Sequence, residues 1–254
     1  LCLDLGRLEQ ADALVAEAAT QLNDHSTIPF VRGMIAARQN RLTEAISLFS
    51  KVLASEPDHV RARLNRCSAS LLKGDLAAAL DDADHLVTNQ PGLDMARLRR
   101  SEVLMNHGDW DEAEAELRRL LENRPEHTMA LVHLGTCLIA RGRAEQAEKP
   151  LNTALQIDTT HSDAWYQRGL LYLDFGRHED AMHDFENAAA HDEHHIDARL
   201  KIATLLHEAE DSKGAAAAWR RVLDVDPEHR LARRRLEECR DGGGPPKPNP
   251  QAEG

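Results

Sequence analysis

Proline and alanine recur along this chain at intervals of 34 residues. Pro57, Pro91 and Pro125 are one interval apart, and three further steps reach Pro227. Twelve residues before this position an alanine stands in every period, at Ala11, Ala45, Ala79, Ala113, Ala147, Ala181 and Ala215. Self-similarity at a fixed interval of this size is the signature of a repeat architecture, in which each unit packs on its neighbours. The chain is therefore expected to consist of copies of one structural unit.

Each period predicts two helices. Seventeen residues before the proline position, six of seven periods carry a residue that tolerates positive φ, namely Gly6, Asn40, Gly74, Gly108, Gly142 and Gly176, with Glu210 in the last. Apolar residues with helical spacing precede this position, as in ALVHLGTCLIARG, and follow it, as in AEAELRRLLENRP. Proline then ends the second helix because it cannot continue one. The small alanine is expected where the paired helices cross closely.

Composition and charge narrow the class of partner. The 254 residues are 42% hydrophobic but only 4% aromatic, which favours helices with a core of Leu, Ala, Val and Ile. Lys and Arg number 31 against 43 Asp and Glu, and the net charge of −12 would repel a phosphate backbone, so nucleic acid is not an expected partner. No apolar run approaches the roughly 20 residues that span a bilayer.

The cysteines and glycines form no motif of catalysis or cofactor binding. Cys2, Cys67, Cys137 and Cys239 are far apart and make no CxxC pair, which disfavours a zinc ribbon, a redox motif and a disulfide framework. No nucleotide-binding glycine motif and no HExxH occur. The sequence thus predicts no enzyme, no metal and no cofactor. Cys67 and Cys137 fall within first helices, and their expected burial as thiols favours a reducing compartment, the cytoplasm.

This pattern resembles the tetratricopeptide repeat family, which has an aromatic residue at position 4 of its repeat, Leu at 7, Gly at 8, Tyr at 11, Ala at 20, Phe at 24, Ala at 27 and Pro at 32. The best match is at Trp165, Gly169, Tyr172, Ala181, Phe185 and Ala188, whereas Arg168 and Glu193 replace the Leu and the Pro. The resemblance implies an all-α, right-handed superhelical solenoid of helix-turn-helix repeats. It also implies a non-catalytic scaffold for protein–protein interaction.

This register divides the chain into full repeats at 26–59, 60–93, 94–127, 128–161, 162–195 and 196–229. Residues 1–25 fit a partial repeat, with a second helix and a remnant of the first. Because Leu1 falls inside a first helix and is not Met, the sequence is expected to be a fragment. Residues 230–241 are predicted to form a C-terminal cap helix, and residues 242–254 a disordered Gly/Pro-rich tail.

Histidine occupies the last position of successive repeats, at His25, His59, His127, His161, His195 and His229, with Leu93 as the exception. A zinc site needs three or four ligands at one point, whereas one histidine per repeat spreads along the stack. The row is therefore interpreted as serving helix ends. His191, His194 and His195 are clustered in HDEHHIDA, which leaves adventitious metal binding or a pH response as the alternative.

In the family that the chain resembles, first helices line a concave groove that positions 2, 5, 6, 9, 12 and 13 face. Position 6 is polar in five consecutive repeats, at Asn65, Arg99, His133, Gln167 and Lys201. The resemblance implies that such donors meet the backbone carbonyls of an extended peptide. The N-terminal half adds Phe30, Met34, Arg61, Leu64 and Met95, together with Leu98, Met129 and Val132, so an apolar or acidic-apolar segment is the favoured ligand.

Other readings of the groove stay open. The polar row fits an ordinary solvated helix face as well, and part of the apolar set fits core packing. Asn65 and Arg99 match an incomplete version of the family's carboxylate clamp, in which Phe30, Met34 and Met95 take the other positions. The C-terminal half offers a wall suited to a basic segment, formed by Asp163, Tyr166, Asp174, Asp197 and Glu208.

Two further functions are compatible with the sequence. The chain could be the substrate-selecting or regulatory module of a larger enzyme whose catalytic domain lies outside residues 1–254. It could also be a self-assembling structural scaffold. In that case the partial repeat, whose Leu1, Leu3 and Leu5 lack a partner helix, would dock on a second copy.

Overall fold

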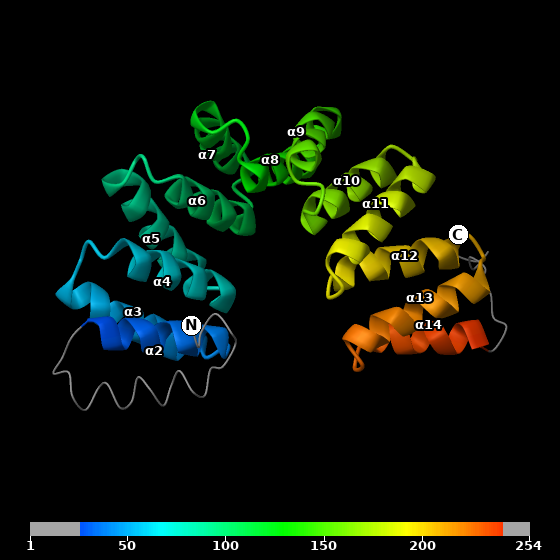
Figure 1. The fold of residues 1–254 in the computed structure, drawn as a ribbon, viewed down its shortest axis with the longest axis horizontal. Coiled ribbons are helices and arrows are strands. Elements are labelled where there is room, and N and C mark those ends of the chain that lie inside the picture. The colour runs from blue at the N-terminus through cyan, green and yellow to red at the C-terminus, as the bar shows by residue number, and fades with distance from the viewer. Residues whose placement is uncertain (1–25, 241–254) are drawn as a thin grey trace, which may run out of the picture. The chain divides into compact units, whose positions relative to one another are not determined.

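The computed structural model describes residues 26–240, which form helices joined by short turns and no strand within that range (Figure 1). The chain divides into two compact units, Leu1–Pro125 and Glu126–Gly254. The first contains α2 (Thr27–Arg38), α3 (Leu42–Ser55), α4 (Val60–Lys73), α5 (Leu76–Asn89), α6 (Asp94–His107) and α7 (Trp110–Asn123). The second contains α8 (Thr128–Ala140), α9 (Ala144–Ile157), α10 (Ser162–Asp174), α11 (His178–His191), α12 (Ile196–Glu208), α13 (Ser212–Val225) and α14 (Arg230–Arg240).

Within each unit the helices pack in chain order. Every helix contacts the next along the chain, and first helices of adjacent repeats also touch, as α2 and α4 do, and α4 and α6. The predicted all-α helical repeat solenoid is confirmed. The predictions for residues 1–25, including His25 and the self-association surface, and for the tail at 242–254 lie outside the described residues.

The turn inside each hairpin has positive φ at the predicted position. The values are 57° at Asn40, 84° at Gly74, 93° at Gly108, 68° at Gly142, 69° at Gly176 and 59° at Glu210. Glu210 adopts the left-handed conformation despite its side chain, because the same turn must be made there. The second helices α3, α5, α7 and α13 each end two residues before a proline, as predicted.

Two fixed positions bring the paired helices together. The periodic alanines within the described residues, from Ala45 to Ala215, are all fully buried. Glycine at position 8 of a repeat lies under a large side chain at position 24. A Cβ on Gly33, Gly135 or Gly169 would come within 2.6–2.7 Å of Phe49, Leu151 or Phe185, respectively. Those contacts are closer than atoms tolerate, so the short distance between the helices depends on the missing side chain.

The histidine row caps the first helices. Nδ1 of each histidine accepts a hydrogen bond from the backbone N–H three residues later, which pairs His59 with Ala62, His127 with Ala130, His161 with Ala164, His195 with Ala198 and His229 with Ala232. The donor–acceptor distances are 3.1–3.3 Å. The predicted role at helix ends is thus confirmed, because each ring satisfies an N–H that has no partner within its helix. The helix after Leu93 has no side-chain cap.

The side chain at position 4 of the repeat stabilises the preceding turn by a hydrogen bond to a backbone carbonyl. Trp165 Nε1 donates to the carbonyl oxygen of Thr159 at 2.8 Å. At the same position of other repeats an arginine donates to a backbone carbonyl oxygen. These pairs are Arg63 with Pro57, Arg97 with Pro91, Arg199 with Glu193 and Arg233 with Pro227. Arginine thereby replaces the family's aromatic residue, because both side chains carry an N–H that reaches a carbonyl six residues back. The sequence pattern did not predict this substitution.

Arginine at position 7 binds a buried carboxylate of its own repeat and a polar side chain of the preceding repeat. Arg168 binds Asp184 with two hydrogen bonds, of 2.7 and 2.9 Å, and reaches Asn152 of the preceding repeat at 2.7 Å. Arg66 binds Asp82 in the same way, at 2.8 and 2.7 Å, and reaches Ser50 at 3.0 Å. Two-pronged pairing of this kind fixes orientation as well as charge. Each carboxylate is buried, so it depends on its arginine for solvation.

The repeat at 94–127 carries a larger version of this network. Glu116 is buried and accepts from Arg97 at 2.8 Å, from Arg100 at 3.3 Å and from Arg119 at 2.9 Å. Arg100 also binds Asp84 of the preceding repeat at 2.5 Å. The charge of one buried carboxylate is thus shared among three guanidinium groups.

In five repeats, positions 7 and 23 carry either an arginine and a carboxylate or no charged residue at all. Arg66, Arg100 and Arg168 stand opposite Asp82, Glu116 and Asp184, whereas Leu134 stands opposite Pro150 and Ile202 opposite Ala218. The repeat at 26–59 differs, since Arg32 stands opposite Leu48 and is only half-buried. The pairing follows from the cost of a lone buried charge, which is several kcal/mol.

Replacing Gly169 by Ala should lower the free energy of unfolding. The clash with the fully buried Phe185 should cost about 3 kcal/mol, the upper end of the usual range for overpacking, which exceeds the gain of about 1 kcal/mol from better helix propensity. Guanidinium unfolding followed by circular dichroism would measure it. Gly92→Ala is the control, because a Cβ there meets nothing within 4 Å. An unchanged midpoint for Gly169→Ala would disprove the close crossing of α10 and α11.

Removing one member of the Arg168–Asp184 pair should be costlier than removing both. Asp184→Ala leaves a guanidinium without its carboxylate and should cost about 3–5 kcal/mol. The double variant Arg168→Ile, Asp184→Ala copies Ile202 and Ala218 of the next repeat and should recover most of that loss. A double-mutant cycle in guanidinium would test this, and additive losses would contradict it.

Candidate functional site

Positions 2, 5, 6, 9, 12 and 13 follow helical spacing and share one side of each first helix. We call this side the first-helix face. In the first unit it is carried by α2, α4 and α6, and in the second by α8, α10 and α12. Every residue of the predicted binding set stands at one of these positions, so the set divides between the two units.

Phe30 and Arg61 form a stacked pair at the start of the first unit's face. Phe30 is only 7% exposed and packs on Phe49, with ring centroids 6.0 Å apart. The ring of His59 lies 5.0 Å away, and the guanidinium carbon of Arg61 lies 5.3 Å above the Phe30 ring. Phe30 is therefore a core residue, and the exposed Arg61 side chain covers it.

The apolar side chains of this face differ in exposure. Met95, in the first turn of α6, is 42% exposed, whereas Met34 and Leu64 are half-buried and Leu98 is buried. The most exposed large apolar side chain within residues 26–240 is Leu72 near the end of α4, at 73% exposure, which sequence reasoning did not single out. The sequence feature that could have identified Leu72 is its place at position 13, one of the positions expected to face the groove. Position 5 turns inward, which explains the burial of Phe30 and Leu98.

The two polar residues predicted for the first unit already bind within the chain. Asn65 Nδ2 donates to the carbonyl of Arg61 at 2.7 Å. Arg99 forms an ion pair with Glu102, one turn further along the same helix. Burial raises the pKa of Glu102, and the charge of Arg99 opposes that rise. A ligand carboxylate would thus share Arg99 with Glu102, while Arg61 has no carboxylate partner within residues 26–240.

The first-helix face of the second unit is acidic. His133, Gln167 and Lys201 are half-buried on α8, α10 and α12, as the polar row requires. Met129 is partly exposed and Val132 is buried. The predicted acidic wall is exposed at Asp163, Asp174, Asp197 and Glu208, with Tyr166 half-buried among them. Burial, together with the charge of Asp197, raises the pKa of Tyr166.

Asp163 is held ionised beside a capping histidine. The Nδ1 atom of His195 accepts the cap hydrogen bond from Ala198, so in the neutral ring the proton is on Nε2. That Nε2 lies 3.5 Å from Asp163 Oδ1, and the ring of Tyr166 lies 4.9 Å from the imidazole. Interaction with His195 lowers the pKa of Asp163. The arrangement offers a fixed negative charge for binding.

The buried thiol and the charged side chains of the described residues were also compared with what a reactive or metal-binding site requires. Burial raises the pKa of the Cys67 thiol to about 12, and its Sγ donates to Ala79 O at 3.2 Å. Within residues 26–240 no group of three His, Cys, Asp or Glu side chains is arranged to hold a metal ion. Over the same stretch no helix has both the length and the hydropathy to cross a bilayer.

Family comparison agrees with the helical pattern. A family model described as tetratricopeptide repeat matches residues 2–55, 30–94 and 98–162, and a second model with the same description matches residues 162–194. These matches cover more than half of the 254 residues. No protein with a curated description matches the sequence.

Solved structures share the architecture. A tetratricopeptide repeat protein from Parabacteroides merdae is similar over 94% of this chain and 94% of its own, with a TM-score of 0.78 and 18% identity. A chain of the APC/C hetero-tetramer Cut9–Hcn1 is similar over 94% of this chain, with a TM-score of 0.78 and 14% identity, and this chain spans 47% of its length. PilW, a type IV pilus biogenesis factor, is similar over 85% of this chain and 98% of its own, with a TM-score of 0.69 and 17% identity. At these identities the likeness shows the fold alone.

Cys67 and Cys137 should not react with Ellman's reagent in the folded protein at pH 8. Both thiols are buried, and the pKa of Cys67, about 12, leaves almost no thiolate at that pH. Their labelling rate should equal the rate of unfolding and rise sharply in guanidinium. Cys239, which is partly exposed, is the internal reference. Rapid labelling of Cys67 in native buffer would contradict its placement in the core.

Proposed function

Because this chain belongs to the tetratricopeptide repeat family, we propose that it is a non-catalytic scaffold that binds a partner peptide or protein segment along its first-helix faces. The family's fold supports a role in protein–protein interaction in general. What carries the finer proposal is the exposed apolar surface of Leu72 and Met95 on a face that also presents Arg61. Exposed apolar groups gathered on one surface are typical of an interaction site.

The first unit's face suits an acidic-apolar segment. Leu72, Met95 and the half-buried Met34 and Leu64 offer apolar contact, and methionine adapts to irregular partners. Arg61 adds an exposed positive charge, while Asn65 and Arg99 supply hydrogen bonds in competition with their own helix. Each apolar side chain of the ligand that becomes buried contributes about 1.5–3 kcal/mol.

The second unit's face suits a basic segment. Asp163, Asp174, Asp197 and Glu208 present negative charge there, and His133, Gln167 and Lys201 supply the polar row. Each unit's face would thus meet a segment of the opposite charge. The buried thiols of Cys67 and Cys137, which form no disulfide, favour the cytoplasm as the compartment in which this binding takes place.

Binding of an acidic-apolar peptide to the first unit should depend on Leu72 and Arg61. Peptides selected from a displayed library against the wild-type protein would be measured by fluorescence anisotropy. Leu72→Asp should weaken binding about tenfold or more, since it removes an apolar contact and adds a like charge. Arg61→Glu should do the same for acidic peptides, with a loss that shrinks as salt rises.

Leu231→Asp is the matched control, because Leu231 is also an exposed leucine, at 39%, but lies on α14 outside both faces. It should bind as the wild type does. Equal affinities for Leu72→Asp, Arg61→Glu and Leu231→Asp would reject the first-helix face as the binding surface. Light scattering over a concentration series would separate ligand binding from self-assembly.

A further inference from the structure

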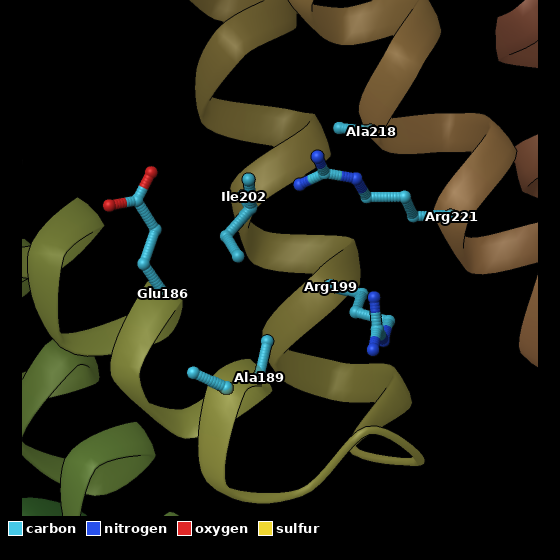
Figure 2. A pocket seen from close by; sticks show the side chains of 7 residues that line it. Glu186, Ala189, Arg199, Ile202, Ala218 and Arg221 are labelled. Atoms are coloured by element: carbon cyan, nitrogen blue, oxygen red, sulfur yellow. The ribbon is translucent and has the colours of Figure 1, made fainter.

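A cavity of about 290 Å³ opens between α11, α12 and α13 in the second unit. Its apolar lining comes from Ala189, Ile202 and Ala218, among other residues. Arg199 and Arg221 line it as well, and Figure 2 shows Glu186 on the opposite side of Ile202 from both arginines. The lining uses second helices and positions 4 and 7 of α12, so the cavity is separate from the first-helix face.

The repeat at 94–127 shows what this place in the fold holds when position 23 carries a carboxylate. Three periods before Arg199 and Arg221 stand Arg97 and Arg119, and between them the Glu116 carboxylate accepts hydrogen bonds of 2.8 and 2.9 Å. In the repeat at 196–229 both arginines are retained, but alanine replaces the glutamate at Ala218. Ile202 likewise replaces Arg100. The cavity therefore includes the place that a carboxylate and a guanidinium fill in the repeat at 94–127.

Two other repeats support the same assignment. Position 23 carries Asp82, which binds Arg63 at 3.0 Å, and Asp184, which binds Arg168. A carboxylate thus fills this place in three repeats, and in each of them it is buried against arginine. The geometry of the backbone around position 23 accordingly suits a carboxylate between the two helices.

The two arginines of the cavity are differently held. Arg199 donates from Nε and Nη2 to Glu193 O, at 3.1 and 2.8 Å, which fixes its guanidinium plane and leaves Nη1. Arg221 is exposed and makes no ion pair or side-chain hydrogen bond within residues 26–240. A carboxylate that meets these guanidinium groups would form charge-assisted hydrogen bonds, which are stronger than bonds between neutral groups. The negative charge of Glu186, which also lines the cavity, would repel an anion bound between the arginines.

We propose that this cavity binds the carboxylate of an aspartate or glutamate side chain presented by a partner polypeptide. The guest carboxylate takes the place of the missing position-23 side chain, and its methylene groups lie against Ala218 and Ile202. Arg221 and the remaining Nη1 of Arg199 donate to it. A side chain from outside can enter because Arg221 and Glu186 lie at the surface.

Titration of the ¹⁵N-labelled protein with an acetylated peptide of alternating Glu and Ala would test the proposal. Amide signals of Ala189, Ile202 and Ala218 should shift, and the matched peptide of alternating Gln and Ala should leave them in place. Arg221→Ala should weaken the interaction about tenfold, which is the loss expected for one charge-assisted hydrogen bond. Glu186→Gln should strengthen it, because the opposing charge is removed.

Ala218→Glu is the sharpest variant. It restores the internal carboxylate of the repeat at 94–127, so it should fold with an unfolding midpoint no lower than that of the wild type and should abolish the shifts. Unmoved signals with the Glu peptide, or equal binding by Arg221→Ala, would overturn the proposal. Shifts caused by inorganic phosphate but not by the Glu peptide would overturn it too. Leu72→Asp, which changes the first-helix face, should leave the shifts of Ala189, Ile202 and Ala218 intact, so failure of the cavity proposal is distinguishable from failure of the proposed function.

Discussion

The close approach of two helices around an alanine is the constraint on which the repeats depend. From Ala45 to Ala215 that residue is fully buried in every described repeat, and glycine next to Phe49, Leu151 or Phe185 narrows the same contact. A short interhelical distance brings positions 7 and 23 within hydrogen-bonding reach of one another. It is this distance that lets Arg168 and Asp184 meet with two hydrogen bonds.

The sequence predicted most of the architecture because the 34-residue repeat places the same turn residues and the same buried residues in every unit. Positive φ at Gly74, buried alanine and histidine at the helix start each follow from one physical requirement that recurs in every repeat. Arginine at position 7 could not be read in this way. The family pattern expects an apolar residue at position 7. The carboxylate that binds the arginine lies 16 residues away in sequence, so only the packed structure shows that the two charges neutralise each other.

The sequence predicted which repeat positions form the candidate binding surfaces, but not which of their side chains are exposed. Position 5 lies at the border between face and core, and the pattern alone did not tell that Phe30 packs inward under Arg61. Position 13 lies at the rim, where the helix ends and its neighbours no longer cover Leu72. Hydrogen bonds within a helix, such as that from Asn65 to Arg61 O, also depend on rotamers that composition does not determine. Residue type and period thus define where a ligand can lie, and packing defines which groups remain to meet it.

The links between neighbouring repeats are unequal. Arg66, Arg100 and Arg168 each reach back to a polar side chain of the preceding repeat, but Ile202 makes no such link to Glu186. In a linear stack, stability is close to a sum of repeat and interface contributions, so a weaker interface is where cooperativity breaks. Between α11 and α12 that contribution comes from Ile202 and Leu205, which pack against Tyr172, Ala181 and Phe185 of the preceding repeat, so the coupling there is apolar where that of the repeats with arginine at position 7 is partly polar.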